Sequence, residues 1–231
     1  MAAYEISPFQ WSMSDWRVWV AAFILMEFTY YWQHRFSHTV RWMWATHAVH
    51  HSPNEFVLPA AFRLGWTGAI SGSWLIHLPV ALLGFHPAMM GAILLVGLRY
   101  QFFLHTEKIG RLGPIDWLFN TPSNHRVHHS SEADFLDKNY GNVLMVFDHM
   151  FGSYAAERPG QTHRYGLTDP FTSNNPLHIV SREWVRLIQD VIASRTPASA
   201  FKAAFGRPSP TPAKPPRASL QLDREVDRHV V

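Results

Sequence analysis

With 231 residues, of which 47% are hydrophobic, 14% aromatic and only 16% charged, the chain can form one domain with a sizeable core, and its charge content lies below that of a typical soluble domain. The absence of cysteine excludes disulfides, thiolate zinc sites, iron–sulfur clusters and cysteine nucleophiles. A formal net charge of only +3, without a dense stripe of basic residues, argues against nucleic acid as a partner and suits the anionic head groups of a lipid bilayer better.

The first long apolar stretch, residues 16–32, is interrupted only by Arg17 near its start and by Glu27. It is about as long as one membrane span, and we expect its helix to continue through His34 and His38. Glu27 lies seven residues before His34 and therefore on the same helix face. Glu27 either faces a site formed by these histidines or is a carboxylate paired with a neighbouring helix.

Two more apolar stretches, residues 66–83 and 88–104, predict a protein that crosses the membrane more than once. The first of them contains Gly68-Ala-Ile-Ser-Gly72, a spacing of small residues that is typical of close helix packing. The last one ends at Gln101 and continues to His105, four residues later, so that these two side chains share a helix face.

The basic residues beside the apolar stretches predict the orientation in the membrane. Arg35, Arg41 and Arg63 lie between the first and second stretch, and Lys108 and Arg111 follow the third, whereas the short connection between the second and third stretch has no Lys or Arg. By the positive-inside rule, all the histidine clusters described below are expected on the cytoplasmic side, and we expect the membrane to be a bacterial inner membrane.

The second half of the chain is more polar. Residues 106–179 contain prolines and turn residues and are expected to form a cap over the helix ends, with 143–151 as a short apolar segment in the core or at the interface. An amphipathic helix is predicted from residue 181, lying on the membrane or against the cap. Residues 207–231 are proline-rich and are expected to be a disordered tail after one domain of residues 1–206.

Histidines recur in three clusters with helical spacing. His34 and His38 are followed after eight residues by a His-x-x-His-His cluster, and a second cluster of that form lies far downstream. Residues three and four apart share a helix face, so each cluster presents two or three imidazoles to one side. One such pair is a weak signal, but three clusters indicate a metal site, because neutral imidazole is a common metal ligand. Together with His105, the candidate ligands are His34, His38, His47, His50, His51, His125, His128 and His129.

Nine imidazoles are too many for one ion, so two metal ions are expected. Imidazole binds iron, copper, zinc and nickel alike, so the ligands do not name the metal. The His-Glu-x-x-His motif of hydrolytic zinc enzymes is absent, and a site at the membrane surface favours redox chemistry on a lipid. Two other classes remain open: a zinc hydrolase or lyase that acts on a lipid, and a membrane protein that transports or stores metal.

The blocks around the clusters are Tyr31-Trp-Gln-His-Arg-Phe-Ser-His38, Trp44-Ala-Thr-His-Ala-Val-His-His-Ser52, Pro122-Ser-Asn-His-Arg-Val-His-His129, Lys138-Asn-Tyr-Gly141 and Phe147-Asp-His-Met-Phe-Gly-Ser153. In sequence and spacing they resemble the fatty acid hydroxylase/sterol desaturase superfamily of membrane di-iron enzymes. The resemblance is strong over residues 23–154 and weaker on to about 207. The short gap between the first two clusters argues against the acyl-CoA and acyl-lipid desaturases, in which this separation is usually longer.

The resemblance implies that the nine histidines are the metal ligands, with no further catalytic residue and no other cofactor-binding residue. Some members have a histidine where this chain has Gln101. His105 is therefore the expected ligand, and Gln101 either supports the ligands from behind or is a weak ligand candidate. Asp137, Asn139 and Asp148 match polar family positions and either orient ligand imidazoles or form turns. The histidines that match no cluster have no expected metal role: His77, His86, His149, His163, His178 and His229.

The resemblance also implies an all-α integral membrane bundle with a cytoplasmic histidine-rich cap around a dimetal site. The implied activity is the O2-dependent hydroxylation or desaturation of a lipid C–H bond by two iron ions, on a sterol, a fatty acyl chain or a related lipid. Electrons would come from NAD(P)H through a ferredoxin- or cytochrome-type partner, since the chain has neither a glycine-rich dinucleotide motif nor a haem motif.

Overall fold

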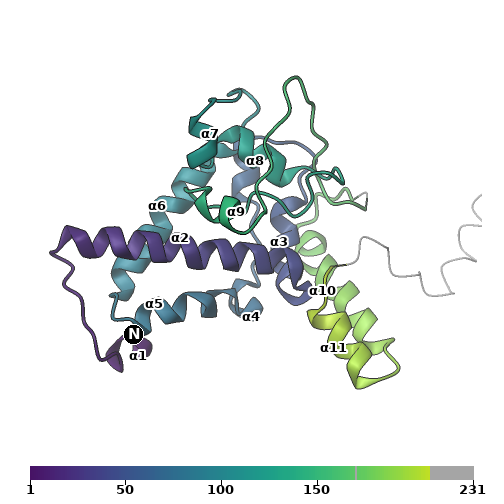
Figure 1. The fold of residues 1–231 in the computed structure, drawn as a ribbon. Helices are drawn as coiled ribbons and strands as arrows, with labels where there is room; N and C mark the ends of the chain where they lie inside the picture. The colour runs from purple at the N-terminus through teal and green to yellow at the C-terminus, as the bar shows by residue number, and fades with distance from the viewer. Residues whose placement is uncertain (170, 209–231) are drawn as a thin grey trace, which may run out of the picture.

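The computed structural model describes residues 1–169 and 171–208, and in these ranges the expected all-α fold is found (Figure 1). The only strand-like pairing there is a single antiparallel bridge between Phe119 and Leu144. Most of the predicted tail, residues 207–231, lies outside the described residues. The helices are α1 (Ala2–Glu5), α2 (Trp16–Thr39), α3 (Arg41–His51), η1 (Leu58–Phe62), α4 (Gly68–Ser71), η2 (Ser73–His77), α5 (Leu78–Leu82), α6 (Pro87–Leu104), α7 (Ile115–Leu118), α8 (Pro122–His129), α9 (Val146–Met150), α10 (Pro176–Ile192) and α11 (Pro197–Phe205), where η marks a 3-10 helix.

Helix α2 runs through the middle of the molecule, with α4 and α5 on one side and α7, α8 and α9 on the other (Figure 1). It starts at Asp15, whose side chain accepts a hydrogen bond from the Arg17 backbone N–H, and it ends where Val40 adopts an extended conformation. Its apolar side buries Ala22 and Met26 in the main core. As predicted, the helix continues without a break through the first two histidines.

The apolar stretch of residues 66–83 is not one helix. Gly72 adopts a left-handed conformation with φ of 70°, which ends α4 and separates it from η2, and Pro79 lies in the first turn of the short α5. The predicted small-residue packing motif therefore does not lie on a continuous helix. Among the described residues, only α6 is both long enough and apolar enough to cross a membrane.

Helix α10 confirms the predicted amphipathic helix but begins earlier, at Pro176, where the Asn175 side chain caps the first turn. It packs on α3 through Trp184, whose ring lies 4.9 Å from that of Trp42 between centroids and nearly perpendicular to it. The apolar face predicted for this helix is not buried as a whole, since Ile192 at its end remains 78% exposed.

At Gly97, helix α6 lies close to the segment that follows residue 140. A methyl group added at Gly97 would lie 2.4 Å from Nδ2 of Asn142, and this amide is held by hydrogen bonds to Glu27 and Gln101. The amide therefore cannot move aside without breaking those bonds. On the same helix, a methyl group at Gly91 would meet no atom within 4 Å.

We expect Gly97→Ala to lower the free energy of unfolding by the ~1–3 kcal/mol that overpacking a well-packed site costs. The melting temperature should therefore fall measurably. Gly91→Ala is the matched control, because it makes the same change at an open position of the same helix and should leave stability equal or slightly raised. Thermal unfolding of both variants in the same detergent measures the difference. Equal melting temperatures would show that the contact between α6 and Asn142 is loose.

Candidate metal centre

The nine predicted histidines converge from four parts of the chain. Helix α2 contributes two of them, α3 and α8 three each, and His105 follows the last residue of α6. They form two groups, in each of which one side-chain nitrogen per residue lies within 4.8 Å of all the others. The first group consists of His34, His38, His47, His51 and His128. The second group consists of His50, His105, His125 and His129.

These imidazoles are held in the neutral form that binds metal. Burial lowers the pKa of His50 to about 3 and that of His105 to about 4. In both groups, burial and then the neighbouring imidazoles place the pKa of further members, His125 and His129 among them, well below the usual value. The ring nitrogens therefore keep a free lone pair at neutral pH.

Main-chain carbonyls orient three of the rings. Each of these rings donates from Nδ1 to a carbonyl oxygen, which leaves the lone pair on Nε2 for the interior of its group. The pairs are His34 with Tyr140 at 2.9 Å, His128 with Lys138 at 2.9 Å, and His105 with Gln101 at 2.8 Å.

The nitrogens that point inward fit metal ions. The Nε2 atoms of His38, His128 and His129 are buried without a hydrogen-bond partner. Nε2 of His47 lies 3.1 Å from Nε2 of His34 and 3.2 Å from Nε2 of His51. Neutral imidazole nitrogens that converge in this way fit a bound cation, and an all-nitrogen donor set suits a transition metal.

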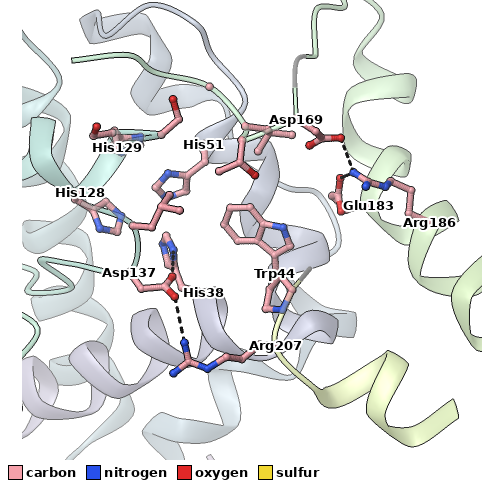
Figure 2. Close-up of a pocket in the computed structure, with 17 residues that line it drawn as sticks. His38, Trp44, His51, His128, His129, Asp137, Asp169, Glu183, Arg186 and Arg207 are labelled. Carbon is pink, nitrogen blue, oxygen red and sulfur yellow. Dashed lines mark hydrogen bonds and ion pairs between the residues drawn. The ribbon is translucent and has the colours of Figure 1, made fainter. Parts of the chain in front are cut away.

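Of the other predicted site residues, only Asp137 brings its side chain close to a ring nitrogen of the two groups. Its carboxylate lies 3.7 Å from Nδ1 of His38 and 3.5 Å from Arg207, as Figure 2 shows. Gln101 holds His105 through its carbonyl, whereas its side chain points toward Tyr30 and Asn142.

Asn139 and Asp148 do not contact an imidazole and instead hold the backbone. Asn139 has a φ of 56° and bonds the main chain of Asn124 and Ala155. Asp148 accepts hydrogen bonds from the backbone N–H groups of Tyr140 and Gly141, at 2.8 and 2.7 Å. Asp148 therefore fixes the peptide group between Tyr140 and Gly141, whose carbonyl holds His34.

Glu27 is a paired carboxylate behind the site and does not face the histidine groups. It is buried and accepts hydrogen bonds from Nδ2 of Asn142 at 2.7 Å and from the backbone N–H groups of Val143 and Leu144 at 2.9 and 2.8 Å. The carboxylate thus ties α2 to the segment that follows Tyr140.

Arg126, inside the third cluster, is a positioning residue that the sequence analysis did not identify. It donates two hydrogen bonds of 2.7 Å to the carboxylate of Glu157 and two more to the carbonyls of Thr106 and Ile109. This guanidinium joins α8 to the segment after His105. The position of Arg126 between His125 and His128 was a possible signal of a role at the site. Its hydrogen-bond partners, however, lie 17 to 31 residues away in the chain and cannot be inferred from local spacing.

Two cavities reach the histidine groups. One has about 220 Å³ and is lined by His38, His51 and His128 together with several charged side chains (Figure 2). The other has about 280 Å³ and lies between α2, α3, α6 and the end of η1. It is lined by histidines of both groups and by Tyr30, Gln33, Ser37, Ala61, Phe62, Leu64, Leu98, Gln101 and Phe102.

A family model described as fatty acid hydroxylase matches residues 19–153, which include all nine histidines. The chain belongs to the fatty acid hydroxylase family. It is 36% identical to the alkylglycerol monooxygenase of Homo sapiens over 96% of this chain and 48% of that protein. It is 42% identical to the alkylglycerol monooxygenase of Danio rerio over 68% of this chain and 34% of that protein.

A third relative is the ornithine lipid hydroxylase OlsE of Rhizobium tropici, to which this chain is 31% identical over 67% of this chain and 46% of that protein. The chain spans half or less of the length of these three relatives. No solved structure matches it.

Proposed function

We propose that this chain is a di-iron, O2-dependent hydroxylase of a membrane lipid, with residues 1–206 as its catalytic domain. The observation that carries the proposal is the convergence of nine neutral, buried imidazoles in two adjoining groups. Relatives named for the oxidation of alkylglycerols and ornithine lipids favour hydroxylation of a lipid. A zinc hydrolase would need a general base beside its metal-bound water, whereas both groups consist of histidines alone.

In this proposal, each histidine group holds one iron ion. Iron bound there would supply the activation of O2 and the oxidation of an unactivated C–H bond. The protein orients the ligand rings through the carbonyls of Gln101, Lys138 and Tyr140 and keeps the imidazoles neutral by burial. The cavity between α2, α3 and α6, which reaches both groups, admits the lipid.

We also propose that the protein is a multi-pass membrane protein of the bacterial inner membrane, with the histidine groups near the cytoplasmic surface. Support comes from the apolar helix α6 and from the basic residues beside the apolar stretches. Electrons would come from NAD(P)H through a ferredoxin- or cytochrome-type donor. A cysteine introduced at the exposed position of Lys108 tests the orientation, because it should react only with a reagent supplied from the cytoplasmic side.

Lipid mass spectrometry tests the proposed activity. Extracts are compared from cells that express the intact protein and from cells with an empty vector, each grown with and without air. We expect a lipid one oxygen atom heavier, seen only with the protein and with air. A lipid two hydrogens lighter would make the protein a desaturase. Activity that persists when zinc replaces iron would identify a hydrolase or lyase instead.

A further inference from the structure

The segment that joins α6 to α8 is unusually apolar for an exposed connection, and it includes the short helix α7 (Figure 1). Single exposed apolar side chains are ordinary on a protein surface, whereas a contiguous group marks contact with a partner or a membrane. Six large apolar side chains of this segment are exposed: Ile109, Leu112, Ile115, Trp117, Leu118 and Phe119.

Helix α7 turns its apolar side chains outward. Asp116 is buried and accepts a hydrogen bond of 2.6 Å from the Thr121 hydroxyl, so this carboxylate faces the protein. The helical turn places Ile115, Trp117 and Leu118 on the other side. All three are exposed, and Trp117 is 58% accessible. The outer face of α7 is therefore apolar and lacks a covering element.

The apolar face continues onto the end of α9. The ring of Trp117 stacks on that of His149 with 4.7 Å between centroids, and His149 in turn lies 4.0 Å from the ring of Tyr154. Met150, next to His149, is 65% exposed. Tryptophan and tyrosine are enriched where a protein meets the head groups of a bilayer, because their rings are apolar and carry one polar group.

Basic side chains accompany this face. Lys108 and Arg111 are exposed and precede α7, whereas the carboxylate of Glu107 accepts a hydrogen bond of 3.0 Å from the Tyr165 hydroxyl. Long basic side chains beside apolar ones suit an anionic lipid surface, since the charge reaches the head groups while the methylenes cover apolar surface. A second copy of the same face would instead bring like charges together.

The face also adjoins the described helix that is apolar enough to span a membrane. This helix, α6, exposes Val96 and Phe103 and ends at Leu104, shortly before the apolar segment begins. A chain that leaves the bilayer at Leu104 keeps the following residues close to the same membrane surface. Lipid therefore fits this face better than a soluble partner does.

The segment is tied to the candidate metal ligands at both ends. It begins directly after His105. Nδ2 of Asn124, in α8, donates to the carbonyls of Asp116 at 2.6 Å and Phe119 at 3.0 Å. Arg126, also in α8, bonds two more carbonyls near the start of the segment. A force on α7 is thus transmitted to the helix that carries three histidines of the two groups.

We propose that residues 108–119 are a membrane-surface anchor, in which the outer face of α7 enters an anionic bilayer at the level of the head groups. Lys108 and Arg111 contact the lipid phosphates, and Met150 extends the apolar contact. Because α8 is bonded to this anchor, the anchor sets the depth of the histidine groups relative to the membrane surface. The inference rests on the proposed membrane location of α6 and not on the proposed oxidation of a lipid.

A fluorescent label on a single cysteine tests the anchor, because the chain has no cysteine of its own. The full-length, iron-loaded protein is placed in nanodiscs of phosphatidylcholine and phosphatidylglycerol and labelled at Leu118→Cys. Val96→Cys, on α6, is the lipid control, and Ala133→Cys, exposed after α8, is the water control. Quenching by nitroxide-bearing lipids reports contact with lipid, and quenching by iodide reports contact with water. We expect the label at position 118 to behave like that at 96.

Three results would overturn the anchor. Iodide quenching at position 118 as strong as at 133 would show a face in water. Protection from both quenchers would show a protein contact, such as a second copy of the chain. Strong iodide quenching at position 96 would remove α6 from the membrane, and the proposed location would fail together with the anchor. The readout involves no turnover, so the proposed activity stands or falls separately.

A double variant tests the two basic residues. Lys108→Gln with Arg111→Gln removes both charges, and Arg195→Gln with Lys202→Gln is the matched control at exposed positions near α11. The insertion equilibrium, read from the two quenching signals at position 118, should fall by up to about 30-fold, since each basic residue at an anionic surface contributes ~1 kcal/mol. The control should not change it, and discs of phosphatidylcholine alone should abolish the difference. Equal quenching in both double variants would contradict the role of the charges.

Discussion

Replacing His128 by alanine should remove activity almost completely. His128 belongs to the first histidine group, its Nε2 is buried without a partner, and the Lys138 carbonyl fixes its ring. Loss of residues that merely orient metal ligands costs ~10–100-fold in affinity or activity, so loss of a ligand should exceed the upper value. The measurements are lipid product formation in cells and the iron content of the purified protein.

His178→Ala is the matched control, because His178 is an exposed histidine on α10 outside both groups. Both variants should be produced in similar amounts and retain similar helical content by circular dichroism. Full activity and full iron content in His128→Ala would remove α8 from the metal site and contradict the proposed ligand set.

Replacing Glu27 by glutamine should destabilise the fold and weaken metal binding together. The carboxylate accepts three hydrogen bonds from residues 142–144, and the NH2 group of glutamine would face N–H groups there. A buried donor left unpaired costs ~1–3 kcal/mol. For a chain of this size, ~2 kcal/mol corresponds to a melting temperature lower by several degrees. Iron content should also fall, because the same segment carries the carbonyl that orients His34.

The control is Glu55→Gln, which makes the same chemical change at an exposed position between α3 and η1. Thermal unfolding and metal analysis of both purified variants give the comparison. If Glu27→Gln melts like its control but loses iron, Glu27 acts on the site directly. If both properties match the control, the carboxylate has no positioning role.

Local spacing made the histidines of the two groups predictable. The intervals of three and four residues within each cluster require only a helix, and helices α2, α3 and α8 form where they were expected. That all clusters meet follows from tertiary packing, and the sequence indicated it only because the basic residues beside the apolar stretches predict one side of the membrane for every cluster. The division of nine histidines into groups of five and four is visible only in the structure.

Other features depend on contacts that have no local pattern. Glu27 and its partners are separated by more than 100 residues, and Arg126 bonds carbonyls that any residue type could supply. Gly72 and Pro79 were possible signals that residues 66–83 do not form one helix. Hydrophobicity alone did not reveal the break, because a small residue in an apolar stretch is compatible with helix packing and with a turn.

The backbone carbonyls of Lys138 and Tyr140 orient the rings of His128 and His34, and every amino acid has such a carbonyl. Replacing the Lys138 side chain leaves its carbonyl in place, so this position can change freely during evolution. Asp137 and Asn139 are restricted differently, because their positive φ values of 59° and 56° exclude β-branched residues. A one-residue insertion or deletion in this turn would shift both carbonyls at once. The turn therefore tolerates a change of chemistry at position 138 but no change of length.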